Sequence, residues 1–239
     1  FKKRYVLLNY FIFFSSMVLT YISGERTAFF FIILIYFYYL FFWQRISKNI
    51  LIISLMSITT IIAITYFNSD IKKRMIDLTA DQLSTNNIDN TKPMELYQGH
   101  FLIAYELFRK NPILGVGPKN YRKHCDNEEK YQQRPYYCTT HPHNTYFQLL
   151  AETGLIGFLI ILLFFISIIF NLSKYFFLFL FKKKKTREDF YLSITLCILI
   201  SLWPFVPSGS FFNNYMSIVY FYPLGIYFAL NNNLVKPKN

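Results

Sequence analysis

The sequence predicts an all-α fold: a polytopic bundle of transmembrane helices with a long extracytoplasmic loop that contains short helices. Three observations lead to this prediction. Of the 239 residues, 54% are hydrophobic and only 16% are charged, below the roughly 25% that is usual for soluble domains. Phe and Tyr number 28 and 20, and a soluble domain of this size would leave large apolar patches exposed. The apolar residues also gather in runs close to the about 20 residues that cross a bilayer.

Six of these runs are predicted to be membrane spans. Their approximate bounds are 5–22, 28–43, 50–67, 154–173, 189–206 and 211–230. The second is short, and the fifth is interrupted at Pro204. Because the chain opens at Phe1 without a signal-peptide pattern, we expect residues 1–239 to be a single membrane domain, the C-terminal part of a longer protein.

The basic residues of the short loops predict the orientation, because Lys and Arg are enriched in cytoplasmic loops. Short segments on one side hold thirteen of them, whereas the short loops on the other side hold only Arg26. The thirteen are Lys2, Lys3, Arg4, Arg45, Lys48, Lys174, Lys182, Lys183, Lys184, Lys185, Arg187, Lys236 and Lys238. We therefore expect the loops 23–27, 68–144 and 207–210 to face away from the cytoplasm.

The net charge of +12 would suggest a nucleic-acid partner in a soluble protein. Here the basic residues flank apolar runs, and the sequence contains no basic-aromatic platform or recognition helix. We therefore expect membrane lipid, and no nucleic acid, as a partner.

The loop 68–144 contains all four histidines of the chain, which are His100, His124, His141 and His143. Histidine is the side chain best suited to move a proton near neutral pH. The alternative is that a solvated loop tolerates histidine better than lipid does. Apolar residues at helical spacing, among them Phe101, Ala104 and Phe108, predict a helix in this loop. That helix should end at Asn111, because the residue before a proline disfavours helix.

Asn144, Gln148 and Glu152 lie four residues apart and would share one face of a helix that opens at His143. A carboxylate this close to a membrane span is costly unless it faces a wet cavity or a partner. The functional hypothesis is a polar wall that leads from His143 to a cavity. The alternative is an amphipathic helix at the membrane interface.

Three cations are candidates for binding an anion. Arg26 is an exception to the charge asymmetry, and a guanidinium binds phosphate oxygens with a planar pair of donors. Lys119 and Arg122 follow a glycine turn at 115–118 and could form a diphosphate pocket with Arg26. The alternatives are an ion pair between Arg26 and Glu25 or another acid, and a solvated basic surface.

Cys125 and Cys138 lie thirteen positions apart in the same loop. Outside the cytoplasm such a pair normally oxidises, which predicts a disulfide. The alternative is a metal site built with His124 and His141, but this spacing fits no standard zinc pattern.

The stretch from His141 to Gly157, HPHNTYFQLLAETGLIG, resembles the O-antigen ligase and O-antigen polymerase family of polytopic membrane glycosyltransferases. The family hallmark is a His, often followed by Asn, with ten residues between it and a Gly-x-x-Gly at the head of a span, and His143 and Gly154 keep that interval. The segment 111–121, NPILGVGPKNY, looks like the family's Pro-x-x-Gly-x-Gly segment, and 23–27, SGERT, looks like its arginine loop. The family often has an Arg at the start of the loop helix, where this chain has His100.

The resemblance implies a reaction and a location. Family members take a glycan from an undecaprenyl-diphosphate carrier at the periplasmic face of the bacterial inner membrane. They transfer it to lipid A–core (ligase) or to a growing polysaccharide (polymerase), without a metal or other cofactor. For this chain the resemblance implies His143 as the catalytic base or acceptor-positioning group, with Arg26, Arg122 and Lys119 on the diphosphate. The supporting candidates are His141, His100, Asn144 and Glu152.

Two other functions remain open. A transporter or flippase of lipid-linked sugars would also present polar groups to a cavity, but such proteins usually place ionisable residues near the middle of the membrane. Here the polar candidates gather in one outward loop, which favours an enzyme. A non-catalytic scaffold is the third possibility. The sequence does not distinguish a ligase from a polymerase, and it does not identify the sugar.

Overall fold

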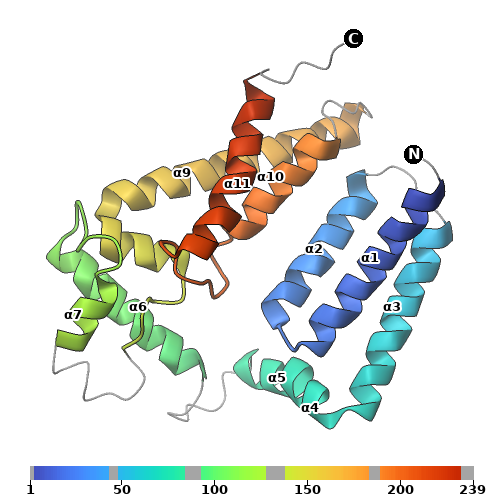
Figure 1. The fold of residues 1–239 in the computed structure, drawn as a ribbon, viewed down its shortest axis with the longest axis horizontal. Helices are drawn as coiled ribbons and strands as arrows, with labels where there is room; N and C mark the ends of the chain where they lie inside the picture. Colours follow the sequence, from blue (N-terminus) through green and yellow to red (C-terminus); the bar gives the residue numbers. More distant parts are fainter. Residues whose placement is uncertain (1–2, 43–47, 84–92, 128–137, 183–188, 233–239) are drawn as a thin grey trace. The chain divides into compact units, whose positions relative to one another are not determined.

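The structure, a computed structural model, describes residues 3–42, 48–83, 93–127, 138–182 and 189–232. Within these ranges the chain is helical and contains no strand, which confirms the predicted all-α class (Figure 1). The chain divides into two compact units, Phe1–Asp89 and Asn90–Asn239, and each is described by itself. That the whole chain forms one membrane domain stays a prediction.

The first unit consists of three long helices followed by three short ones. They are α1 (Lys3–Ile22), α2 (Arg26–Phe42), α3 (Lys48–Phe67), α4 (Ser69–Lys72), the π-helix η1 (Lys73–Asp77) and α5 (Leu78–Leu83). α1 packs against both α2 and α3. The turn between α1 and α2 needs a glycine, because Gly24 has φ +71°, a conformation that other residues adopt at a cost.

The second unit contains the predicted chemistry. Its helices are α6 (Pro93–Lys110), α7 (Tyr121–Asn127), α9 (Thr145–Lys182), α10 (Asp189–Ser201) and α11 (Asn214–Asn231). α9 packs against α6 at its start and against α10 further along, and α10 packs against α11. α6 ends just before Asn111, as the following proline predicts.

The buried face of α6 coincides only in part with the apolar residues whose helical spacing predicted this helix. Ile103, Ala104 and Leu107 are at most 1% exposed, whereas Tyr105 is half exposed. The small side chain of Ala104 lets the helix approach Ala151 of α9, which belongs to the same core cluster. The face of α6 that packs on α9 therefore includes Ala104 and leaves Tyr105 outside the core.

α9 begins nine residues before the predicted span and breaks at its predicted start, Gly154, which has φ +63° and ψ −160°. The break frees the carbonyl groups of Ala151 and Glu152. These accept hydrogen bonds from the N–H groups of Val116 and Gly117, both at 2.9 Å. The loop after α6 therefore fills the break, and the two glycine motifs of the sequence form a single backbone junction.

The last two helices are shorter than the predicted spans. α10 ends at Ser201, because the chain cannot continue as a helix into Pro204. α11 starts at Asn214, because the side chain of Asn213 caps it by accepting the N–H of Tyr215 at 3.0 Å. The predicted loop 207–210 is therefore too short: the segment between these helices is 202–213.

Two helices are long and apolar enough to cross a membrane: α3, over Asn49–Phe67, and α9, over Thr145–Leu178. Three shorter apolar helices are Leu8–Ile22, Arg26–Tyr38 and Phe190–Ser201. The six-span topology is therefore a proposal, supported by these helices and by the charge asymmetry of the sequence.

The orientation leads to a first testable prediction. A reporter fused after Asn90 should be active outside the cytoplasm, and one fused after Lys184 should be active inside it, because of the positive-inside asymmetry. Paired alkaline phosphatase and green fluorescent protein fusions measure this. Both fusion points lie outside the described residues. The opposite pattern would place loop 68–144 in the cytoplasm and overturn the predicted site.

Candidate functional site

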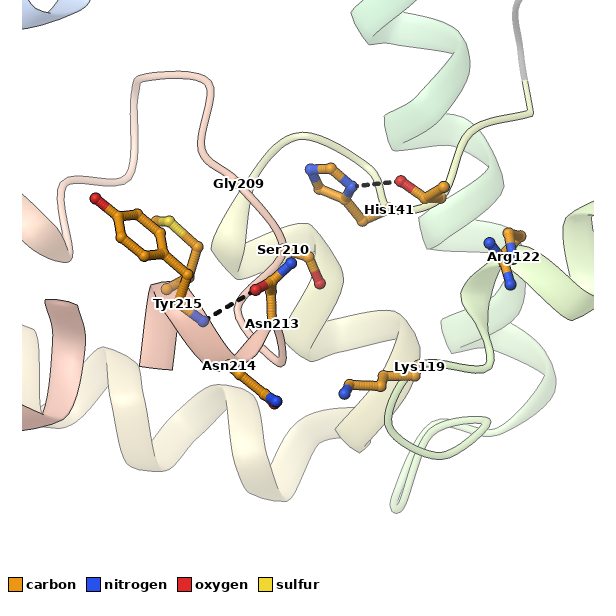
Figure 2. A pocket seen from close by; sticks show the side chains of 10 residues that line it. Lys119, Arg122, His141, Gly209, Ser210, Asn213, Asn214 and Tyr215 are labelled. Carbon is orange, nitrogen blue, oxygen red and sulfur yellow. Dashed lines mark hydrogen bonds between the residues drawn. The ribbon is translucent and has the colours of Figure 1, made fainter. Parts of the chain in front are cut away.

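A pocket of about 650 Å³ lies within the second unit (Figure 2). Four parts of the chain line it: the turn after α6, the first turn of α7, the segment before α9, and the segment that leads into α11 together with the first turn of that helix. The lining residues are Lys119, Arg122, Thr140, His141, Gly209, Ser210, Asn213, Asn214, Tyr215 and Met216. Three residues singled out from the sequence for different reasons, Lys119, Arg122 and His141, therefore line the same pocket.

The turn after the glycine motif presents the two cations. Lys119 has φ +63°, a left-handed conformation. The side chain of Asn120 holds this turn by donating to the carbonyl of Val116 at 2.9 Å. Arg122 follows in the first turn of α7. Both cations are exposed, so they are accessible to an anionic ligand.

Three of the four histidines come together. The ring of His143 lies 4.3 Å from that of His141 and 5.4 Å from that of His100, measured between ring centroids. His100 is buried, at 4% exposure. His124 is exposed in α7 and is not among the residues that line the pocket. Their shared position in one loop gives no reason to distinguish among the four histidines. Only the fold shows that His124 does not belong to the cluster of the other three.

The backbone holds His143 in a defined position. Its φ is +54°, in the left-handed region that His, Asn and Asp adopt more readily than most residues. Its carbonyl accepts the N–H of Ser208 at 2.9 Å. The histidine segment is thereby tied to the segment before α11.

Burial, followed by the neighbouring His141 and His100, lowers the pKa of His143 to about 4. Burial also lowers the pKa of His141, which the backbone of Ser208 partly offsets and His100 reinforces. Both imidazoles are therefore neutral at physiological pH, and each has a ring nitrogen with a lone pair that can accept a proton or a hydrogen bond.

His141 is the histidine that lines the pocket. One of its ring nitrogens, Nδ1, lies 2.9 Å from the hydroxyl of Thr140. Its other nitrogen, Nε2, is buried and meets no partner in good hydrogen-bond geometry among the described residues. Thr140 therefore orients the ring through Nδ1.

The predicted polar face of α9 holds the walls of the pocket in place. Asn144 caps the helix by accepting the N–H of Tyr146 at 2.9 Å, and it donates to the carbonyl of Pro204 at 2.7 Å. Gln148 accepts the N–H of Phe211 at 2.8 Å. These contacts attach the segment 202–213 to the start of α9.

Glu152 attaches the start of α7 to α9 by accepting a hydrogen bond from the backbone. It is 1% exposed, and one carboxylate oxygen accepts the N–H of Tyr121 at 2.9 Å. The other oxygen accepts from Gln148 at 3.0 Å. Gln148 and Glu152 thus join both loops that line the pocket to one helix. This gives a physical reason for a carboxylate near a span: its charge is met by buried donors.

Arg26 belongs to the first unit. Its guanidinium donates to the hydroxyl of Thr79 at 3.3 Å. Glu25, considered above as its partner, pairs with Arg74 at 3.3 Å, and Arg74 also donates to the carbonyl of Gly24 at 3.1 Å. The role of Arg26 at a diphosphate stays a prediction.

Cys125 and Cys138 form a disulfide, with their Cα atoms 5.5 Å apart. The bond uses both thiols that the alternative metal site required. Among the described residues, no group of three His, Cys, Asp or Glu side chains has the arrangement of a metal site. The disulfide connects the end of α7 with the segment that leads to His141.

The cysteine pair leads to a second prediction. Both thiols should resist maleimide labelling in native membranes until a reductant is added, because the loop is expected in an oxidising compartment. Closing a loop of this size typically stabilises a protein by about 3 kcal/mol in the chain-entropy model, so reduction should also lower the melting temperature. Labelling of both cysteines without reductant would show that the disulfide does not form in the cell.

The sequence analysis missed the segment 208–216, which forms one wall of the pocket. A signal was present: Ser208-Gly209-Ser210 and Asn213-Asn214 are polar residues between two apolar runs, on the side assigned to the other candidates. That signal does not connect the segment to the histidines, because the sequence does not say which outward loops meet.

Comparisons with known proteins identify the class. A sequence model of O-antigen ligases matches residues 11–162, well over half of the chain. The chain therefore belongs to the O-antigen ligase family, a bacterial membrane-embedded family that acts in surface polysaccharide biosynthesis. No curated protein and no solved structure matches the chain.

Proposed function

We propose that the protein is a membrane glycosyltransferase. It transfers a glycan from a polyprenyl-diphosphate carrier to lipid A–core or to a growing polysaccharide, at the periplasmic face of the bacterial inner membrane. Family membership supports a glycosyltransferase-like enzyme in O-antigen processing. The carrier, the acceptor and the membrane face are the proposed parts.

One observation carries this proposal. Lys119 and Arg122 line the same pocket as His141, whose ring contacts that of His143. The reaction needs this combination, because a lipid diphosphate leaves as an anion while a sugar hydroxyl attacks. Cations stabilise the charge that develops on the leaving group, and a neutral imidazole accepts the proton of the hydroxyl.

His143 is the proposed base or acceptor-positioning group. Its pKa of about 4 makes it a weak base, since a general base works best with a pKa near the operating pH. A bound diphosphate would raise that pKa, because a nearby negative charge favours the imidazolium. The donor itself would thus make His143 more basic at the moment when transfer requires it.

The experiment that tests this function is deletion of the gene in the parent organism, followed by electrophoresis of its surface polysaccharide. If the protein is a ligase, polysaccharide-capped lipid A–core should disappear. If it is a polymerase, single repeat units on the core should remain. An unchanged polysaccharide pattern would refute the proposed function, and a plasmid-borne copy that restores the pattern is the control.

Arg26 leads to a third prediction. Arg26→Ala should abolish transfer, and Arg26→Lys should restore it poorly, because lysine keeps the charge but loses the two parallel donors that match a phosphate. Glycan transfer in membranes at matched protein levels measures this. Arg74→Lys is a control, since Arg74 pairs with Glu25 in an exposed position. Full activity of Arg26→Lys would reduce Arg26 to a point charge, and full activity of Arg26→Ala would exclude it from the diphosphate site.

A further inference from the structure

We propose that the segment 208–216 is the sugar-recognition wall of the pocket, and that Asn214 and Tyr215 bind the sugar that is attached to the donor diphosphate. This inference rests on the proposed function. It assigns a substrate-binding role to a part of the chain that lies beyond the family match, which ends at residue 162.

The pocket has room for a ligand larger than a diphosphate. Its volume of about 650 Å³ lies in the middle of the roughly 300–1,000 Å³ that small-molecule sites occupy. Lys119 and Arg122 are the cations among its lining residues. The rest of the lining is neutral and includes hydroxyl, amide and aromatic side chains, which are suited to an uncharged polar molecule.

Figure 2 shows how the charged and the neutral side chains are arranged around the pocket. The side chains of Lys119 and Asn214 point toward one another across the pocket, while the ring of Tyr215 lies on the side opposite Arg122. A donor with its diphosphate at Lys119 would therefore place its first sugar against Asn214. The next part of the glycan would reach Tyr215.

The chemistry of these two residues fits a sugar. The amide of asparagine offers both a donor and an acceptor, which matches the paired hydroxyl groups of a pyranose. The ring of tyrosine offers a flat apolar face with a polar tip, which can cover the C–H face of a sugar. Tyr215 is 73% exposed, so its ring is available to a ligand, and no part of the fold depends on burying it.

The wall is held in place although its binding side chains are exposed. Gln148 accepts the N–H of Phe211 at 2.8 Å and donates to the hydroxyl of Ser210 at 3.0 Å. The side-chain oxygen of Asn213 caps α11 by accepting the N–H of Tyr215 at 3.0 Å. Asn214 and Tyr215 thus stand on the first turn of a capped helix, which limits the ordering cost of binding.

The test uses the full-length protein in membranes, with the lipid-linked glycan that accumulates when the gene is deleted as the donor. Asn214→Ala and Tyr215→Ala should each raise KM for this donor about three- to tenfold, the effect expected from one lost hydrogen bond or one lost aromatic contact. KM for the acceptor and kcat should change little. Tyr215→Phe should keep most of the affinity, because the ring remains.

Two further variants sharpen the result. Asn214→Asp should raise KM for the donor more than Asn214→Ala, because a carboxylate facing Lys119 competes with the diphosphate for its charge. Tyr222→Ala is the matched control: Tyr222 is 70% exposed on the same helix and is not among the lining residues of the pocket. Its donor KM should stay at the wild-type value.

The outcomes separate this inference from the proposed function. If the wild-type protein transfers no glycan, the proposed function fails. If it does transfer glycan, but Asn214→Ala and Tyr215→Ala keep the wild-type KM for the donor, only the sugar-recognition wall is overturned. A rise in KM for the acceptor alone would also overturn it, because the segment would then bind the other substrate.

Discussion

Replacing His143 with alanine is expected to lower the rate of glycan transfer by about 10²–10⁴-fold, the usual cost of removing a general base, in a protein that still folds and inserts. The reason is the position of His143, next to His141 of the pocket and to the buried His100. The measurement is transfer of lipid-linked glycan in membranes at matched protein levels.

A second substitution separates chemistry from backbone strain. His143 has φ +54°, and alanine adopts this conformation less readily than asparagine does. His143→Asn should therefore keep the local backbone and lose activity to the same extent. His124→Ala is the control, because His124 is exposed outside the histidine cluster, and it should have at most a mild effect.

His141 is the competing candidate, since it lines the pocket itself. Full activity of His143→Ala together with loss of activity in His141→Ala would move the catalytic role two residues upstream. Loss of activity in both variants would indicate that the two rings act as a pair, and a double variant would then lose no more than either single one.

The lowered pKa of His143 also makes the stability of the folded protein depend on pH. An unfolded histidine titrates near 6.5, whereas His143 in the folded protein titrates near 4. Between these values the unfolded state binds more protons, so the protein should lose stability as the pH falls from about 6.5 to 4. In His143→Asn this loss of stability should be smaller. The fall of kcat/KM at low pH should then be set by titratable groups other than His143.

Gly115→Ala is expected to destabilise the second unit strongly. Gly115 has φ +67°, and an added Cβ would lie 2.4 Å from the backbone carbon of Glu152. The left-handed conformation costs alanine about 1–2 kcal/mol, and the overlap costs about 1–3 kcal/mol. The overlap cannot be relieved by a side-chain rotation, because the atoms that the Cβ meets belong to the backbone of Glu152, Thr153 and Gly154 at the break in α9.

Gly225→Ala is the matched control for that prediction. Gly225 lies inside α11, and a Cβ built there meets no atom within 4 Å. Alanine should be neutral or stabilise the helix by up to about 1 kcal/mol. Thermal unfolding in detergent, followed by circular dichroism, measures both variants. Equal melting temperatures for Gly115→Ala and Gly225→Ala would show that the junction at the break is not as tight as described.

The sequence was sufficient for properties that depend on local composition. Apolar runs place the helices to within a few residues, apart from the extended α9 and shortened α10, because helix formation and burial in lipid both follow from consecutive side chains. Pro112 ends α6, and Asn144 opens α9, because a missing N–H and a side-chain cap act within one turn. The segments at 111–121 and 141–157 indicated the family, which the match over residues 11–162 shows.

The tertiary structure decided which of these local features meet. Glycine spacing did not reveal that Gly115 and Gly154 pack backbone to backbone. The polar face of Asn144, Gln148 and Glu152 was interpreted as a wall toward a cavity, whereas these side chains bind the backbone of two loops. These backbone contacts and hydrogen bonds join residues many positions apart in the sequence. Whether they form depends on distances in the folded chain, which no local pattern encodes.

For this protein the sequence alone therefore determined the helical class and the residue types available for chemistry, because these follow from local composition. The outward orientation of loop 68–144 stays a prediction from the charge asymmetry. Only the tertiary structure brought Lys119, Arg122 and His141 to one pocket, separated His124 from the other histidines, and added the segment 208–216 as a wall. The physical reason is that a pocket forms where loops from different helices converge, and that convergence is set by the packing of α6, α9, α10 and α11.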